Sequence, residues 1–193
     1  MIGLLDVKTY LRDIARTRRN IFSKIKEGDV VPKSRRYWYV VDNVEVFRQL
    51  GDFEEGVLPY GSINRYLHGP RQEIVKLFGG RLDIKFSEAV SSRLGECLEK
   101  SLLAHLIMQR INPTFLVRGY MNYSEEIGGW LRAFNIYLTG KESFLIDTQL
   151  PIQSNGGKKT FIVPIFGISE INERVLIPQY CGRNYYLRKP SFN

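Results

Sequence analysis

Residues 97–110 constrain the fold more than any other segment, because they are apolar around most of the circumference of a helix. They read Cys-Leu-Glu-Lys-Ser-Leu-Leu-Ala-His-Leu-Ile-Met-Gln-Arg. A helix of this kind is normally buried at the centre of a domain. Pro113 follows shortly afterwards, and the residue before a proline disfavours the helical conformation. The sequence therefore predicts a buried central helix that begins with Cys97 and ends near Asn112.

The order of the other elements indicates the fold class. Helical patterns precede the central helix and strand-like runs follow it, which favours an α+β fold with helices packed on a mostly antiparallel sheet. A length of 193 residues fits one domain-sized core. A strand is also predicted at 36–42, with its aromatic side chains in the core, and Asp42 is expected to cap a short helix that runs through Leu50. The helical patterns cover 3–26, 70–79 and 86–94, and the later strand-like runs cover 114–121, 130–138, 143–147, 160–166 and 184–188.

Positive charge is concentrated near the N-terminus. The chain has a formal net charge of +8, and residues 1–36 contain ten Lys or Arg against four acids. A solvated face of the helix predicted at 3–26 is the simpler interpretation of this charge. The alternative is that the basic residues attract an anionic partner such as nucleic acid. The candidate anion-binding residues are Arg12, Arg16, Arg19, Arg35 and Arg36.

Several classes of protein are not indicated. No apolar run approaches the ~20 residues that cross a bilayer. Two histidines and two cysteines are few for a metal site or a disulfide framework, and Cys181 is expected to be a small buried or turn residue. Phosphate-loop, dinucleotide-binding, HExxH and CxxC motifs are not found. We therefore expect no cofactor, metal or membrane contact, and a location in the reducing cytoplasm without a secretory signal.

Cys97 is the first candidate for chemistry, because it opens the central helix after Gly95 and Glu96. Backbone N–H groups and the macrodipole at a helix N-terminus lower the pKa of a thiol. Such a thiolate attacks an amide or ester carbonyl when a base takes its proton and a carboxylate orients that base. A lone cysteine, however, is more often a plain buried residue.

Three further motifs follow Cys97 in order: Phe-Leu-Val-Arg-Gly-Tyr ending at Tyr120, Arg-Ala-Phe-Asn beginning at Arg132, and Phe-Leu-Ile-Asp-Thr-Gln around Asp147. Together they resemble the transglutaminase-like branch of the papain-like cysteine enzymes, across about residues 90–150. In that family a histidine in a His-Ala-Trp or His-Ala-Phe motif stands on one strand, and an acid closes the next strand. The resemblance implies a core at 86–193, Cys97 as the nucleophile and Asp147 as the orienting acid. It also implies amide hydrolysis, deamidation or transamidation through a thioester, and it leaves open whether 1–85 is a separate domain.

The chain departs from this family at Arg132, which stands where the family has its histidine. A guanidinium has a pKa above ~12 and cannot accept a proton from the thiol. An ion pair between Arg132 and Asp147 would preserve the local geometry. The resemblance then implies a pseudoenzyme that binds a protein or peptide partner in the inherited cleft. Two alternatives stay open: an active cysteine amidase or protease that uses His68 as a relocated base, and a nucleic-acid-binding protein that uses the basic N-terminus.

Overall fold

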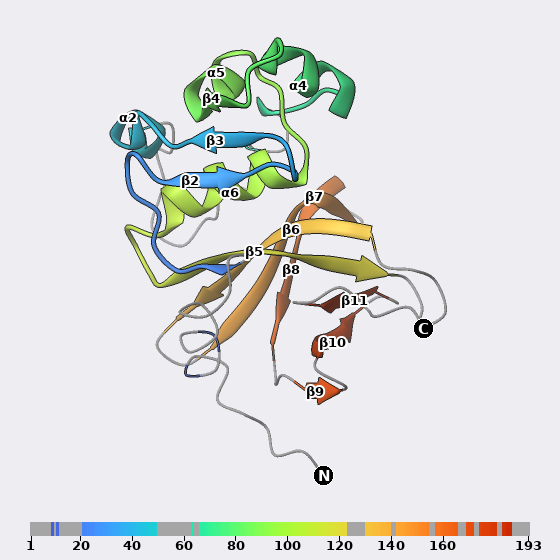
Figure 1. Cartoon of the computed structure of the whole chain (residues 1–193). Helices are drawn as coiled ribbons and strands as arrows, with labels where there is room; N and C mark the ends of the chain where they lie inside the picture. The colour runs from blue at the N-terminus through green and yellow to red at the C-terminus, as the bar shows by residue number, and fades with distance from the viewer. Residues whose placement is uncertain are drawn as a thin grey trace.

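The protein consists of a large antiparallel sheet, a central helix packed on it, and a layer of small elements on the other side of that helix (Figure 1). The central helix is α6 (Cys97–Met108), and it lies between the two sheets in Figure 1. This arrangement confirms the α+β class with a mostly antiparallel sheet. The computed structural model describes residues 9, 11, 21–49, 63, 66–122, 130–139, 142–154, 157–165, 169–171, 174–180 and 183–186.

The large sheet contains eight strands and every pairing in it is antiparallel. Four strands form a meander: β5 (Thr114–Asn122), β6 (Trp130–Leu138), β7 (Ser143–Ser154) and β8 (Gly157–Pro164). On the other side of β5 the sheet continues through β11 (Arg183–Tyr186), β10 (Arg174–Tyr180) and β9 (Ser169–Ile171). A short strand, β1 (Ile21–Phe22), also pairs with β5. The five strand-like runs predicted after the central helix are confirmed as β5, β6, β7, β8 and β11.

Among the described residues, the layer above α6 contains a second sheet and the short helices α2, α4 and α5. In this sheet β2 (Val30–Pro32) pairs antiparallel with β3 (Trp38–Val40), which pairs parallel with β4 (Asp83–Lys85). The helices are α2 (Val44–Gln49), α4 (Arg71–Phe78) and α5 (Phe86–Ser91). The predicted core position of the aromatics on β3 is confirmed for Tyr39, which is fully buried and packs against Phe78 and Phe86.

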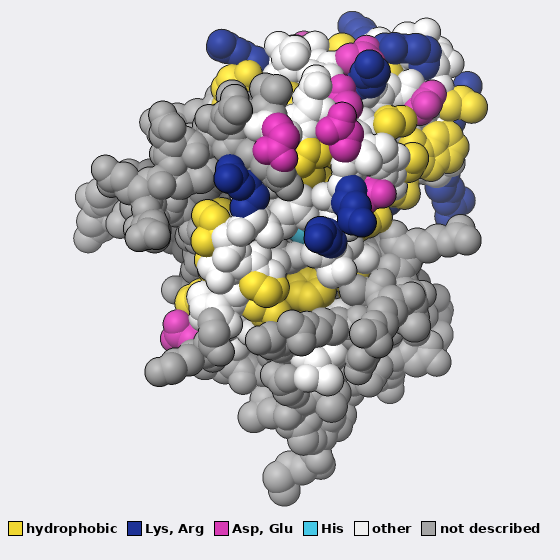
Figure 2. All heavy atoms as spheres, turned by 90° about the vertical axis from the view of Figure 1, so that its left-hand side faces the viewer, with side chains coloured by type: hydrophobic (Ala, Val, Ile, Leu, Met, Phe, Trp, Pro, Cys, Tyr) yellow, Lys and Arg dark blue, Asp and Glu magenta, His cyan; other side chains and the backbone are white. Residues whose placement is uncertain are grey.

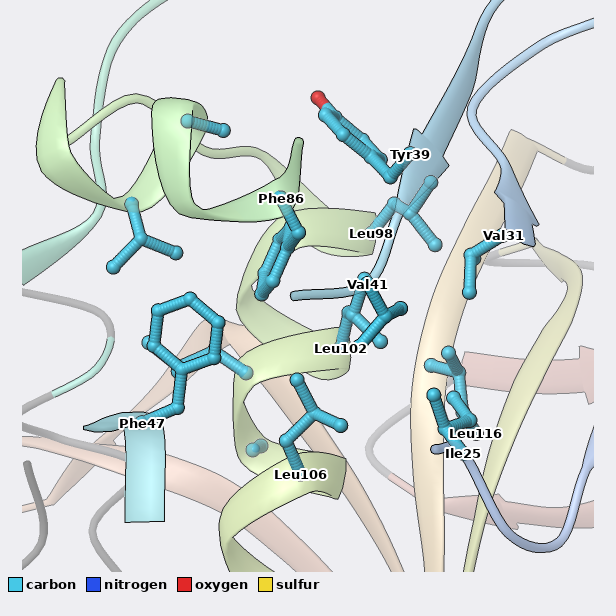
Figure 3. Close-up of a cluster of buried hydrophobic side chains, with 14 of the residues drawn as sticks. Ile25, Val31, Tyr39, Val41, Phe47, Phe86, Leu98, Leu102, Leu106 and Leu116 are labelled. Carbon is cyan, nitrogen blue, oxygen red and sulfur yellow. The ribbon is translucent and has the colours of Figure 1, made fainter. Parts of the chain in front are cut away.

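One hydrophobic cluster joins this upper layer to α6. Leu98, Leu102 and Leu106 of α6 lie beside side chains of the upper layer, among them Val41 and Phe86 (Figure 3). Every residue of α6 from Leu98 to Met108 is buried, as the apolar pattern predicts. The described part of residues 21–85 therefore shares its core with the central helix.

The helix predicted at 3–26 is wrong in its C-terminal part. Ile21 lies in strand β1 opposite Val117, and Ile25 lies in the segment that follows this strand. Both isoleucines are buried, so the helical spacing of apolar residues identified core positions but not their local structure. The backbone of Ile25 bonds with the side chain of Gln109, which accepts from its N–H at 3.0 Å and donates to its carbonyl at 2.8 Å. Gly28 lies in a turn with φ of 87°, rather than at the end of a helix.

Asp42 has a different role from the one predicted. The short helix after it is confirmed as α2, but the Asp42 carboxylate binds Ser87 near the start of α5. It accepts a hydrogen bond from the Ser87 N–H at 2.9 Å and one from the Ser87 hydroxyl at 2.6 Å. Asp42 therefore joins two segments that are 45 residues apart in sequence.

His105 on α6 is fully buried, and neither ring nitrogen has a hydrogen-bond partner among the described residues. Burial lowers the pKa of His105 to about 3, and the nearby Gln109, whose amide is bound to Ile25, only slightly opposes this shift. Because this pKa is lowered in the folded state, the unfolded chain takes up the proton first as the pH falls below ~6.5. His105 should therefore remove about 2–3 kcal/mol of stability between pH 7.5 and pH 4.5.

Urea unfolding of the wild type and of His105→Leu at these two pH values measures the contribution of His105. The variant is expected to lose less stability on acidification than the wild type by this same amount. His68→Gln is the matched control, since His68 is exposed. An equal acid-induced loss in His105→Leu and wild type would contradict the prediction.

Candidate functional site

The three positions that the sequence singles out are brought to the start of α6. Cys97 is the first residue of α6, while Arg132 lies on β6 and Asp147 on β7. The Arg132 Nε donates to Asp147 Oδ2 at 2.8 Å, and its Nη2 donates to Oδ1 at 3.0 Å. The predicted bidentate ion pair is therefore present. The charge of Arg132 also acts on the pKa of the Cys97 thiol, so this pair lies close to the cysteine.

A second donor holds Asp147 from the other side. The Tyr185 hydroxyl, on β11, donates to Asp147 Oδ2 at 3.0 Å, and both side chains are buried. The Tyr185 ring packs edge-on against Phe134, with centroids 5.2 Å apart. Sequence reasoning missed Tyr185, because no motif links β11 to the β6–β7 hairpin. The Asp147 carboxylate is thus held by donors on two strands, β6 and β11, which lie on opposite sides of β5 in the sheet.

The expected lowering of the Cys97 pKa is wrong. Burial raises the pKa of the thiol, and this effect exceeds the opposing effects of the Arg132 charge and of a hydrogen bond from the Ala133 backbone. The thiol is partly buried at the cavity wall, and there the cost of removing an ionised group from water exceeds the stabilisation by the nearby positive charges. Cys97 therefore favours the neutral thiol near pH 7.

The segment before Cys97 is tightly packed, which explains Gly95. A Cβ atom at Gly95 would lie 2.9 Å from Leu67 Cβ and 3.0 Å from Glu99 Cβ, closer than side-chain atoms approach. The Gly95 N–H donates to the carbonyl of His68 at 2.9 Å. The His68 backbone therefore lies against Gly95, which is two residues before Cys97 in the sequence. The exposed His68 side chain does not line the cavity described next. The role of His68 as a relocated base stays a prediction.

A cavity of about 200 Å³ opens at the start of α6. Four of its lining residues are basic, namely Lys33, Arg71, Arg118 and Arg132, and one is acidic, Glu96. Cys97, Leu98, Leu131 and Ala133 complete the lining. Sequence reasoning did not place Arg71 or Arg118 in an anion site, because α4 and β5 contribute them and no spacing along the chain connects the two. Lys33 was a candidate phosphate contact only as one of the basic residues near the N-terminus.

Two of the four cations have a carboxylate partner and two do not, within the described ranges. Lys33 Nζ lies 2.7 Å from Glu99 Oε1, and Arg132 pairs with Asp147. Arg118 is partly buried, and its Nη2 donates a hydrogen bond to the Lys33 carbonyl at 3.3 Å. Among the described residues, neither Arg118 nor Arg71, the exposed first residue of α4, forms an ion pair with a carboxylate. The cavity thus contains positive charge that the described acids do not neutralise.

A buried hydrogen-bond network supports the floor of this cavity. Glu99, which is fully buried, accepts from Lys33 and also from the Tyr39 hydroxyl at 2.7 Å and the Glu96 N–H at 2.9 Å. Burial alone would raise the pKa of Glu99, but the charge of Lys33 and these hydrogen bonds lower it below its usual value. Glu99 therefore stays ionised and keeps Lys33 at the cavity wall.

The other candidate residues lie apart from this cavity. Arg35 and Arg36 are exposed, and the Arg36 guanidinium lies 5.8 Å from the centre of the Tyr37 ring. On the face seen in Figure 2, basic side chains stand among acidic ones instead of forming a surface of one sign. Predictions for Arg12, Arg16, Arg19 and Cys181 fall outside the described residues. A second cavity, of about 590 Å³, lies at the C-terminal end of α6 and includes both basic and acidic side chains in its lining.

Comparison with known proteins does not assign the chain to a family: no family model matches it, and no curated protein or solved structure gives a significant match. The resemblance to transglutaminase-like enzymes stays a prediction from the motifs at Cys97, Arg132 and Asp147. Across the described ranges, no helix is both long and apolar enough to cross a bilayer. The same ranges contain no group of three His, Cys, Asp or Glu side chains placed to hold a metal ion.

Proposed function

We propose that the chain is a non-catalytic binding domain with the Cys–Arg–Asp arrangement of a disabled transglutaminase-like enzyme. Its cavity at the start of α6 binds an anionic group carried by a protein or peptide partner. The proposal depends above all on the ion pair between Arg132 and Asp147 beside Cys97. In an active enzyme of this class, the acid would instead orient a histidine.

Two features oppose catalysis by Cys97. The first is that Arg132 remains protonated, so it neither takes the thiol proton nor returns a proton to a leaving amine. The second is that burial raises the pKa of Cys97, so the nucleophilic thiolate is scarce at neutral pH. Loss of a general acid–base alone typically lowers the rate by about 10²–10⁴-fold.

The composition of the cavity supports anion binding. Arg71 and Arg118 bring two guanidinium groups to its wall, and a guanidinium offers a planar fork of donors that matches an oxyanion. The wall also includes the first turn of α6, where backbone N–H groups favour negative charge. Because the site is partly enclosed, the attraction is less screened by salt than it is at an open surface.

The first experiment measures turnover and binding on the same protein. Ammonia release from a glutamine-containing peptide by the wild type should equal the background seen with Cys97→Ala. Titration of the wild type with sodium sulfate, followed by amide NMR, should shift the Cys97 and Leu98 signals until they saturate. Cys97→Ala should bind sulfate as the wild type does.

Matched arginine variants locate the binding. Arg118→Gln keeps a donor for the Lys33 carbonyl but removes the charge, and it should weaken sulfate binding about tenfold. Arg110→Gln removes the same charge at the exposed far end of the helix region and should have no effect. Ammonia release that disappears in both Cys97→Ala and His68→Ala would overturn the proposal and support the active enzyme. If Arg118→Gln binds sulfate with the same affinity as the wild type, this cavity is not the sulfate-binding site.

A further inference from the structure

The charges around the cavity indicate more about the anion than its sign. The cavity wall includes four cations, namely Lys33, Arg71, Arg118 and Arg132. The described carboxylates at or behind the wall are Glu96, Glu99 and Asp147. Each of these carboxylates lies within ion-pair distance of Lys33 or Arg132, which leaves two guanidinium groups of the wall without such a contact among the described residues.

The positions of the ion pairs show which cations of the wall they leave without a carboxylate. Glu99 is directed at Lys33 and Asp147 at Arg132, so both of these carboxylates are already bound behind the wall. The third carboxylate, Glu96, has its Oε2 3.4 Å from the same Lys33 nitrogen. Arg71 and Arg118 are left as the two cavity guanidiniums without a described carboxylate partner. They come from α4 and β5, so an anion between them would be held from two separate elements.

The cysteine adds no opposing charge. Because Cys97 lines the cavity as a thiol, it does not repel an anion, and the Cys97 and Leu98 N–H groups lie in the first turn of α6. Leu98, Leu131 and Ala133 give the cavity an apolar side. A ligand that combines a compact, highly charged head with an apolar stem matches this lining.

We infer that the cavity selects the dianion of a phosphate monoester over singly charged anions. This inference rests on the proposed function and narrows the class of its ligand. A phosphoryl group carries a charge of about −1.5 to −2 near pH 7 and offers three acceptor oxygens. It can therefore neutralise both Arg71 and Arg118, whereas a carboxylate or a sulfate ester supplies one charge and leaves one guanidinium uncompensated.

The test compares two probes of nearly equal shape. Phenyl phosphate is mainly a dianion at pH 7.5, and phenyl sulfate is a monoanion. Calorimetric titration of the full chain should give at least about tenfold tighter binding of phenyl phosphate, the effect expected of one additional charged hydrogen bond. Lowering the pH to 5 protonates the phosphate monoester once and should remove most of this preference.

Variants and outcomes separate this inference from the proposed function. Arg71→Gln, at an exposed residue, and Arg118→Gln should each reduce the ratio of the two affinities towards one, while Arg110→Gln should preserve it. Equal binding of both probes by the wild type would overturn the phosphate preference and leave a general anion site. Absence of binding by either probe would overturn both proposals. Release of phenol from phenyl phosphate would contradict the non-catalytic role but not phosphoryl recognition.

The source of the phosphoryl group is resolved by a second set of titrations. Three probes share the phosphoryl group and differ in what it is attached to. They are inorganic phosphate, free phosphoserine and an alanine-flanked phosphoserine tripeptide. Tighter binding of the tripeptide would identify a phosphorylated protein side chain as the ligand. Equal binding of all three would identify a small phosphorylated molecule.

Discussion

Asp147→Asn is expected to lower the free energy of unfolding by about 3–5 kcal/mol, because it leaves the buried Arg132 guanidinium without its counter-charge. The Asp147 side chain is fully buried and that of Arg132 is 10% exposed, so water does not replace the lost carboxylate. Asparagine keeps the approximate shape and an acceptor oxygen for Tyr185, which restricts the change to the charge and one acceptor. Urea unfolding at pH 7, followed by circular dichroism, measures the effect.

A variant without either charge separates the cost of an unpaired Arg132 from the loss of the ion pair itself. Arg132→Met with Asp147→Leu removes both charges, and this double variant should be more stable than Asp147→Asn. Removing both partners leaves no uncompensated charge, although it still removes the hydrogen bond from Tyr185. If Asp147→Asn unfolds within about 1 kcal/mol of the wild type, the pair behaves as a solvated surface contact instead.

The central helix and the strands that follow it were predictable because their signals are local. A helix that is apolar on all sides is stable only when it is buried, and α6 is buried from Leu98 to Met108. The strands β5 to β8 have strand-like sequence patterns, although the run predicted at 143–147 covers only the first part of β7. The ion pair of Arg132 with Asp147 was also predictable, since the motif resemblance places a histidine and its orienting acid at these two positions.

The N-terminal elements were less predictable because distant contacts override their local pattern. Ile21 and Ile25 have helical spacing. Ile21, however, lies in β1, which pairs with β5, and the backbone of Ile25 is hydrogen-bonded to the Gln109 side chain. Strands of two or three residues, such as β2 and β4, carry too short a pattern to detect. The pairing of β4 with β3 also joins distant segments, with Trp38 opposite Asp83, and a local pattern does not specify such a contact.

The chemistry of the site was predictable in its residue types but not in its electrostatics. The position of Cys97 at a helix start suggested a lowered pKa, whereas burial raises it. Burial at that position depends on β6 and on the Lys33 segment, neither of which is adjacent in sequence. Arg71 and Arg118 reach the same cavity from α4 and β5 for a comparable reason. A cavity of this kind is a property of the assembled layers.

The second large effect is expected at Glu99, where the Gln variant should lose about 3–5 kcal/mol of stability at pH 7. Glu99 is fully buried and its carboxylate is 2.7 Å from Lys33 Nζ, whose own side chain is 9% exposed. Glutamine keeps the size and one acceptor but leaves the Lys33 ammonium without its buried partner. Lys33 should then move away from the cavity wall, so sulfate binding should also change in this variant.

Glu96→Gln is the matched control, because Glu96 is 3.4 Å from the same lysine nitrogen but its side chain is 28% exposed. Glu96→Gln should lower the free energy of unfolding by less than about 1 kcal/mol, as for other solvated ion pairs.

The pH dependence of stability gives a second criterion. Since the pKa of Glu99 is lowered in the folded state, its contribution is complete above the usual glutamate value and is lost as the pH falls through the folded value. Glu99→Gln should therefore lose less stability on acidification than the wild type. Equal losses at pH 7 for Glu96→Gln and Glu99→Gln would show that burial does not distinguish the two carboxylates, and that Lys33 is held by its exposed partner as firmly as by the buried one.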